Sequence, residues 1–245
     1  MGPAGMARVA LAIGAAFLGV GCGPSEERPV ERSAFLGDVS ELEPGKGDDP
    51  SLVYISPAVD FSAYESVVID PVSVWHASGS SPDRPPVAEL RALAERFESA
   101  IRTRMQESSF EVVGEPRAGT MRIRAALAES GHGQTKLDLS HAHGAIADAN
   151  AKISADTLAF LRRGAIELEL VDAVTGERLA AAIDDHLVAA PGEEARDRLA
   201  SDAAAWRDVE AFLDARARRL AARLSALHQL RDPEPARPSA RPEGE

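Results

Sequence analysis

The sequence predicts an α+β domain, a two-layer sandwich in which about five mostly antiparallel strands carry two long helices on one face. Several segments alternate apolar and charged residues, the period of a strand with one buried face. Two longer segments repeat apolar residues at helical spacing, one after the first strand and one at the end. The chain has 245 residues, 44% hydrophobic and only 4% aromatic, so we expect one core of mainly aliphatic side chains.

The first strand and the first helix are predicted in the stretch that follows the N-terminal region. Residues 66–75 are rich in β-branched side chains and predict a strand. Pro71 within it indicates an edge or a bulge, because proline cannot donate a hydrogen bond to a neighbouring strand. A Ser/Gly/Pro loop over residues 76–86 follows, and its last two prolines suit the first turn of a helix. Apolar residues at helical spacing then predict that helix over residues 90–105.

Two strands are predicted next. Residues 110–113 form a short one. Residues 120–127 form a clearer one, in which four apolar residues alternate with Arg122 and Arg124. The arginines should therefore share one face of the sheet, opposite the apolar face.

A hairpin is predicted from residue 166 onward. Residues 166–170 alternate apolar side chains with Glu167 and Glu169, and a Val-Thr-Gly-Glu turn leads into a strand over residues 179–188. The stretch 130–163 predicts only a loop and a short helix near residues 156–161. A long helix over residues 202–230 closes the domain, since seven apolar residues follow one stripe along it.

The first 22 residues have the features of a lipoprotein export signal. Residues 1–8 carry one positive charge, and residues 9–20 form an uncharged, mostly apolar run, shorter than the roughly 20 residues that span a bilayer. The run ends in Leu-Gly-Val-Gly before Cys22, which resembles a lipobox with its leucine one place too far away. We predict that residues 1–21 are a cleaved signal peptide and that Cys22 carries lipid. The alternatives are an ordinary cleaved signal and an uncleaved N-terminal anchor.

The charge and the residue after Cys22 bear on location and partners. The net charge is −12, and Arg8 is the only charge in residues 1–21, so the chain from Cys22 has 26 basic and 39 acidic residues, a net charge of −13. Such a body repels nucleic-acid phosphates, which excludes nucleic-acid binding. Gly23 stands where an aspartate would retain an enteric lipoprotein in the inner membrane. We therefore expect a lipid-anchored protein of the cell envelope, facing the periplasm and attached to the outer membrane.

The composition divides the mature chain into three parts. Residues 22–50 are rich in Pro, Gly, Glu and Asp, without a sustained period, and predict a lipidated N-terminus with a flexible tether. An apolar patch over residues 34–36 is the exception. Residues 51–231 form the single domain, and residues 232–245, with four prolines among charged residues, predict a disordered tail.

Short motifs spread over residues 33–230 match a known family. They are Phe35-Leu36-Gly37-Asp38, Leu42, Pro44-Gly45, Tyr54, Pro57, Asp60, Tyr64, Val68-Ile69-Asp70-Pro71-Val72, Trp75, Arg122-Ile123-Arg124-Ala125, Glu167-Leu168-Glu169-Leu170-Val171-Asp172, Thr175-Gly176-Glu177 and Trp206. In these pieces the chain resembles the bacterial envelope lipoproteins grouped as domain-of-unknown-function family 3313. The resemblance implies an exported lipoprotein domain, supplies no catalytic residue, and implies that the patch around Phe35 belongs to the domain.

The histidines offer a weak metal site. His132, His141 and His143 surround Asp138, and in an extended segment His141 and His143 would project to one side, as a zinc or copper pair requires. No fourth ligand is fixed by the spacing, so we favour incidental histidines on a solvated loop. We predict no metal and no cofactor.

Carboxylates are the other candidates. Glu167 and Glu169 could do acid/base chemistry if their environments separated their pKa values. We favour a structural role instead, because Arg122 and Arg124 have the same spacing on another strand and could pair with them across the sheet. Asp70 and Asp172 lie near strand ends, where they would line a cleft with the glutamates or bind turn backbone.

The sequence carries no recognisable catalytic motif: it has no Gly-x-Ser-x-Gly, His-Glu-x-x-His, Walker or Cys-x-x-Cys pattern. We therefore expect a non-enzymatic accessory or interaction module, bound to the membrane through its lipid and to another envelope protein. The alternative is a periplasmic small-ligand-binding protein or a hydrolase, with a cleft built from Asp70, Asp172, Glu167 and Glu169.

Overall fold

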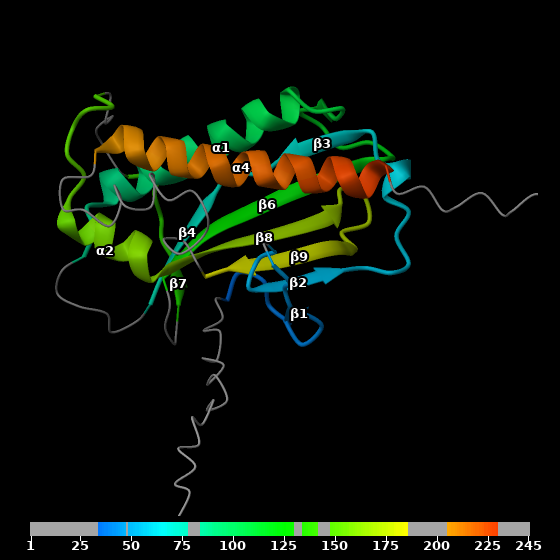
Figure 1. Cartoon of the computed structure of the whole chain (residues 1–245), viewed down its shortest axis with the longest axis horizontal. Coiled ribbons are helices and arrows are strands. Elements are labelled where there is room, and N and C mark those ends of the chain that lie inside the picture. The colour runs from blue at the N-terminus through cyan, green and yellow to red at the C-terminus, as the bar shows by residue number, and fades with distance from the viewer. Residues whose placement is uncertain are drawn as a thin grey trace, which may run out of the picture.

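The computed structural model describes residues 34–47, 49–77, 84–129, 134–141, 148–185 and 205–229. These residues form a mixed α/β domain with one open sheet of nine strands and three α-helices. The predicted class is confirmed at that level, and the prediction of about five strands and two helices is wrong in number. The added strands are mostly short, and the added helix is the one expected near residues 156–161. Figure 1 shows the long helices lying together across the sheet.

The sheet has a long central ladder and short strands at its edges. The strand order is β1-β2-β9-β8-β6-β3-β5, with β4 also on β6 and β7 on β4. β3 is parallel to β5 and to β6, and β4 is parallel to β6, whereas the other described pairings are antiparallel. The strands are β1 (Glu43–Pro44), β2 (Leu52–Ile55), β3 (Ser66–Ile69), β4 (Ser73–His76), β5 (Glu111–Val112), β6 (Thr120–Glu129), β7 (Thr135–Lys136), β8 (Gly164–Asp172) and β9 (Arg178–Asp184).

The predicted strand over residues 66–75 is two strands. β3 and β4 both run parallel to β6, and the three residues around Pro71 separate them. Proline has no N–H to donate, so it interrupts the ladder where the sequence predicted an edge or a bulge. The hairpin of β8 and β9 is confirmed, and its turn contains Gly176 at a φ of 76°, a conformation that glycine adopts without a Cβ penalty.

The three helices begin and end close to the predicted positions. They are α1 (Val87–Gln106), α2 (Ala155–Arg163) and α4 (Trp206–Gln229); residues 202–204 of the predicted last helix lie outside the described residues. Ser154 caps α2 by accepting a hydrogen bond from the Thr157 N–H at 3.2 Å. All three carry charged residues, and none of the helices in the described parts of the chain could span a bilayer.

α1 and α4 lie side by side on the same face of the sheet. Their apolar stripes share one core with the helix-facing residues of β3, β6 and β8. Ion pairs join the helices: Arg104 Nη2 donates to Asp214 Oδ2 at 2.7 Å, and Arg96 Nε donates to Glu210 Oε1 at 2.8 Å. Two helices cannot cover every strand, and the same face of β9 and β2 extends beyond α4 (Figure 1).

The N-terminal segment, residues 34–47, packs on the opposite face of the sheet. Leu36 and Val39 are 3% and 5% exposed and form a second small core with Ala165, Ala181 and Ile183. β1 within this segment pairs with β2. The predicted tether over residues 22–50 is therefore too long, because the domain already includes residue 34. The family resemblance had implied this for Phe35.

We expect burial to set the cost of shortening a side chain in the sheet. Val67→Ala removes methyl groups from a side chain that is 0% exposed, so unfolding should require about 2 kcal/mol less free energy. Val174→Ala, at a turn residue that is 64% exposed, is the matched control and should change stability by less than about 0.5 kcal/mol. Urea unfolding measures both, and similar losses would contradict this placement of β3.

Candidate functional site

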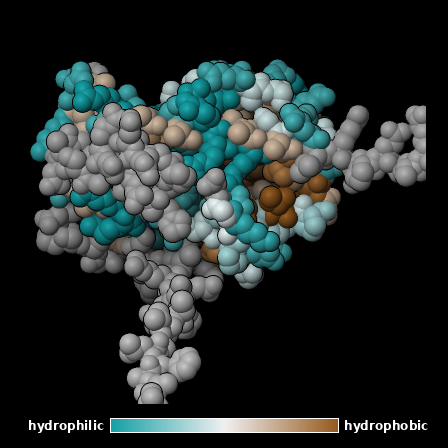
Figure 2. Space-filling model, in the orientation of Figure 1, coloured by the Kyte–Doolittle hydropathy of each residue, from teal (hydrophilic) through white to brown (hydrophobic). Residues whose placement is uncertain are grey.

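An apolar groove runs between α4 and the strands β8, β9 and β2. Its cavity has a volume of about 270 Å³. The lining side chains are mainly aliphatic and include Val53, Ile55, Leu168, Ala182, Leu220 and Leu224. Figure 2 shows hydrophobic surface in brown beside the C-terminal part of α4. Ile55 of this lining is 46% exposed.

The groove follows from the sequences of β8, β9 and β2. Leu168 lies opposite Ala182 in the ladder, and Ala182 lies opposite Val53, so these three share the helix-facing side. On this side β9 contributes the short side chains of Ala180 and Ala182, whereas Ala181 between them faces the N-terminal segment. Because no described helix lies over this part of the sheet, a hollow remains.

Three arginines of α4 line the rim. Arg216, Arg219 and Arg223 are three and four residues apart and so lie along one side of the helix. Arg216 forms an ion pair with Asp184 of β9, and Arg223 Nη2 lies 2.8 Å from Asp49 Oδ1. Arg219 stands between these two bridges. Burial lowers the pKa of the Arg216 guanidinium; Asp184 opposes that effect, and the charge of Arg219 adds to it.

The groove can hold an apolar group beside a positive charge. The backbone groups of β8, β9 and β2 are engaged in their ladders, so the floor presents side-chain methyl groups. The rim is positively charged, whereas the whole chain has a net charge of −12. The sequence analysis missed this site, since neither the uncovered strands nor the arginine spacing points to it without the sheet order.

The predicted pairing of arginines with glutamates is confirmed in part. β6 and β8 are neighbours, Arg124 lies opposite Glu169, and the two form an ion pair. Glu169, only 5% exposed, also accepts a hydrogen bond from Arg178 Nε at 2.8 Å. Arg122 instead lies opposite Val171, and its Nη1 donates to Asp70 Oδ1 at 2.5 Å.

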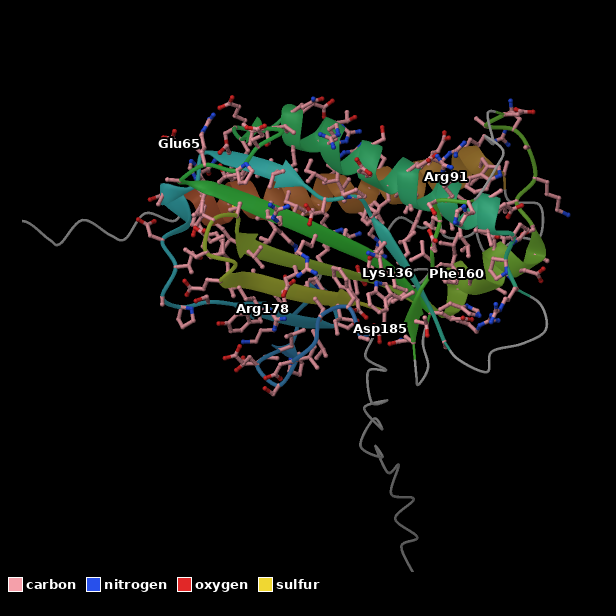
Figure 3. All side chains as sticks on the ribbon, turned by 180° about the vertical axis from the view of Figure 1, so that it is seen from behind. Glu65, Arg91, Lys136, Phe160, Arg178 and Asp185 are labelled. Atoms are coloured by element: carbon pink, nitrogen blue, oxygen red, sulfur yellow. The ribbon has the colours of Figure 1, made fainter. Side chains whose placement is uncertain are left out.

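Glu169 helps to hold the N-terminal segment in place. Arg178, fixed by Glu169, donates to the backbone carbonyls of Leu36 and Asp38, and the Arg124 guanidinium lies 5.3 Å from the ring centre of Phe35. Figure 3 shows Arg178 close to this segment, which is drawn in blue. The carboxylate therefore has a structural role.

The structure places the four predicted carboxylates outside the groove. Glu167 is 1% exposed and lies opposite Ala126. Asp172 accepts hydrogen bonds from the N–H groups of Val174 and Thr175 in the hairpin turn, at 2.8 and 2.7 Å, the alternative considered for it. None of Asp70, Asp172, Glu167 and Glu169 lines the groove.

The histidine cluster cannot be assembled from the described residues. His141 is exposed and its Nε2 lies 3.8 Å from Asp138 Oδ2. His132, His143 and Cys22 lie outside the described residues. Within those residues, no group of three or more histidine, cysteine, aspartate or glutamate side chains is arranged to hold a metal ion.

A buried contact between His76 and Glu129, at the ends of β4 and β6, escaped the sequence analysis. His76 Nδ1 lies 2.7 Å from Glu129 Oε2, and Arg163 Nη2 lies 3.2 Å from the other carboxylate oxygen. The two side chains meet because β4 and β6 are parallel neighbours, which no local pattern indicates. Neither residue lines the groove, so we assign the pair to the structure of the sheet.

Exchanging charges should reveal which pairs meet. Glu169→Arg places like charges together in a buried network and should cost on the order of 3 kcal/mol of unfolding free energy. Adding Arg124→Glu should restore part of the loss, whereas adding Arg122→Glu should restore none, because Arg122 pairs with Asp70. Equal rescue by both in urea unfolding would contradict these pairings.

The Tyr64 hydroxyl should lose its proton at a higher pH than an ordinary tyrosine. Burial and a hydrogen bond donated to Asp172 Oδ2 at 3.0 Å raise its pKa to about 12. Since an unfolded tyrosine has a pKa of about 10, this stabilisation is complete below about pH 10 and is lost as the pH rises towards the folded value. Tyr64→Phe should remove the absorbance transition near pH 12, and Asp172→Asn should shift it downwards. A late transition that survives Tyr64→Phe would refute the assignment.

Comparisons with known proteins give one family and two distant structural likenesses. No curated protein matches the sequence significantly. A dodecamer of a PelC variant from Paraburkholderia phytofirmans has a TM-score of 0.27 and 11% identity, over 66% of this chain and 94% of that one. A DUF4136 family protein from Bacteroides thetaiotaomicron has a TM-score of 0.36 and 10% identity, over 71% and 95%. At these scores neither carries any argument about this chain.

The family suggested by the sequence motifs is confirmed. The family described as protein of unknown function (DUF3313) matches residues 31–220, well over half of the 245 residues. The match begins close to the N-terminal segment that packs on the sheet and ends within α4. The chain therefore belongs to the DUF3313 family.

Proposed function

We propose that this protein is a non-enzymatic binding module that a lipid on Cys22 holds at the periplasmic side of the bacterial outer membrane. Its binding surface is the apolar groove beside α4. The observation that carries the proposal is the groove itself: aliphatic side chains line a cavity of about 270 Å³ at the surface, where burying them in a partner would be favourable.

The folded N-terminal segment supports a role for the anchor. Leu36 and Val39 are buried against the sheet, and Arg178 binds the backbone of the same segment. Twelve residue steps separate Cys22 from Ala34, a length that spans at most about 43 Å. A lipid on Cys22 would thus keep the domain next to its membrane and raise its effective concentration near a membrane-bound partner.

The contacts of the four carboxylates favour our proposal over the hydrolase alternative. That alternative depends on a cleft lined by Asp70, Asp172, Glu167 and Glu169. Asp70 instead pairs with Arg122, Asp172 binds turn backbone, and none of the four lines the groove. The small-ligand form of that alternative was predicted at the same carboxylates and not at the apolar groove. A ligand-binding protein of that kind would not need attachment to the membrane, whereas our proposal requires it.

Release from the membrane tests the proposal. Cys22→Ala should abolish fatty-acid labelling and membrane partitioning, since Cys22 is the only cysteine. A photo-crosslinker at Leu220, in the groove, should capture an envelope component in the anchored chain and several-fold less in the released one. Far-UV circular dichroism should show that both chains are folded.

A crosslinker at Glu95 provides the matched control. Its side chain is 60% exposed on α1, and Glu95 does not line the groove, so little specific capture is expected there. Capture that is equal at Leu220 and Glu95 would contradict the groove as the binding surface. A released chain that fully complements a deletion strain would contradict the need for an anchor.

A further inference from the structure

We propose that the groove binds the hydrocarbon chain of a free fatty acid and that Arg219 binds its carboxylate. This inference rests on the proposed function, because it names a ligand for the same groove. It is built on the groove's apolar floor, on the two ion pairs that cross its opening, and on the charge of Arg219 between them.

The floor suits a hydrocarbon better than an extended peptide. A peptide strand must hydrogen-bond its own N–H and C=O groups when it is buried. β9 is hydrogen-bonded on one side to β8 and on the other to β2, so its backbone has no free edge there. Leu168, Ala182 and Val53 present only methyl and methylene groups. A hydrocarbon chain has no polar group to satisfy and gains from burial alone.

The opening suits a thin ligand. The Arg216–Asp184 pair joins α4 to β9, and the Arg223–Asp49 pair joins α4 to the segment before β2. Both pairs therefore cross the mouth of the groove. The two bridges divide the access to the groove, which favours a thin ligand such as a single acyl chain over a folded segment.

The arginine rim favours a ligand that carries a single negative charge. Arg216 and Arg223 are each neutralised by a carboxylate, whereas Arg219, between them, has no ion-pair partner among the described residues. It is half-buried beside the apolar lining. A guanidinium binds a carboxylate through two parallel hydrogen bonds, so a fatty acid with its chain in the groove would satisfy it. A long-chain alcohol would fill the groove and leave the charge unmatched.

Dodecanoate and dodecanol are the two probes, titrated by calorimetry into the complete mature chain in its Cys22→Ala form. We expect one dodecanoate per chain and binding of dodecanol that is about tenfold weaker, because it lacks the charge-assisted hydrogen bonds. Arg219→Gln should weaken dodecanoate by about tenfold and leave dodecanol unchanged. Arg218→Gln, at the adjacent exposed position, which pairs with Asp214, should change neither.

Two variants that fill the groove test its occupancy. Ala182→Leu puts a larger side chain on the strand side of the groove. Leu220→Trp puts a larger one on the helix side, where the native residue is only half-buried. Each should abolish binding of both probes while circular dichroism shows a folded chain. Leu220→Trp keeps the test valid if Ala182→Leu does not fold.

Each other result would overturn the inference. Binding that survives both filling variants would place the ligand elsewhere, and equal affinity for the two probes would remove Arg219 from the site. A dimer that Leu220→Trp dissociates in sedimentation would make a second copy the occupant. Groove crosslinks to an envelope protein without dodecanoate binding would refute this inference alone. Dodecanoate binding by a chain that needs no anchor would refute the proposed function alone.

Discussion

The antiparallel ladder between β6 and β8 is the constraint on which the rest of the structure depends. Nine residue pairs run without interruption from Met121 and Asp172 to Glu129 and Gly164. Successive side chains of a strand point to opposite faces, so a shift by one residue would exchange every apolar and charged side chain of the pair. The alternation thus sends Ile123 and Leu127 towards the helices and Arg124 and Glu169 to the opposite face.

The charged face becomes the support for the N-terminal segment. Glu169 holds Arg124 and Arg178, and Arg178 in turn binds the backbone of residues 36 and 38. A buried carboxylate with two guanidinium partners is costly to disrupt, because either partner would be left with an unmatched charge. A feature that could be mistaken for a catalytic pair therefore stabilises the start of the domain. If Cys22 carries the anchor, the same network determines where the domain begins relative to the membrane.

The apolar face has more surface than α1 and α4 can cover. Over β3, β6 and β8 their apolar stripes complete the core, whereas over β9 and β2 the alanines of β9 leave a groove with an arginine rim. Burying these side chains against a ligand or a partner would be favourable. This reasoning, and not a catalytic constellation, is the basis for the binding role that we propose.

The sequence by itself determined the elements with a sustained local period. The α1 and α4 helices, the β6 strand and the β8–β9 hairpin were predicted because their patterns repeat over five or more residues of one segment. Strands of two residues, such as β1 and β7, are too short to show a period, and β4 was hidden within the prediction for β3. Only the tertiary structure decided that Arg122 pairs with Asp70, that His76 meets Glu129, and that α4 leaves a groove above β9. Each of these depends on which distant strands become neighbours, and that choice is made by the packing of the whole chain.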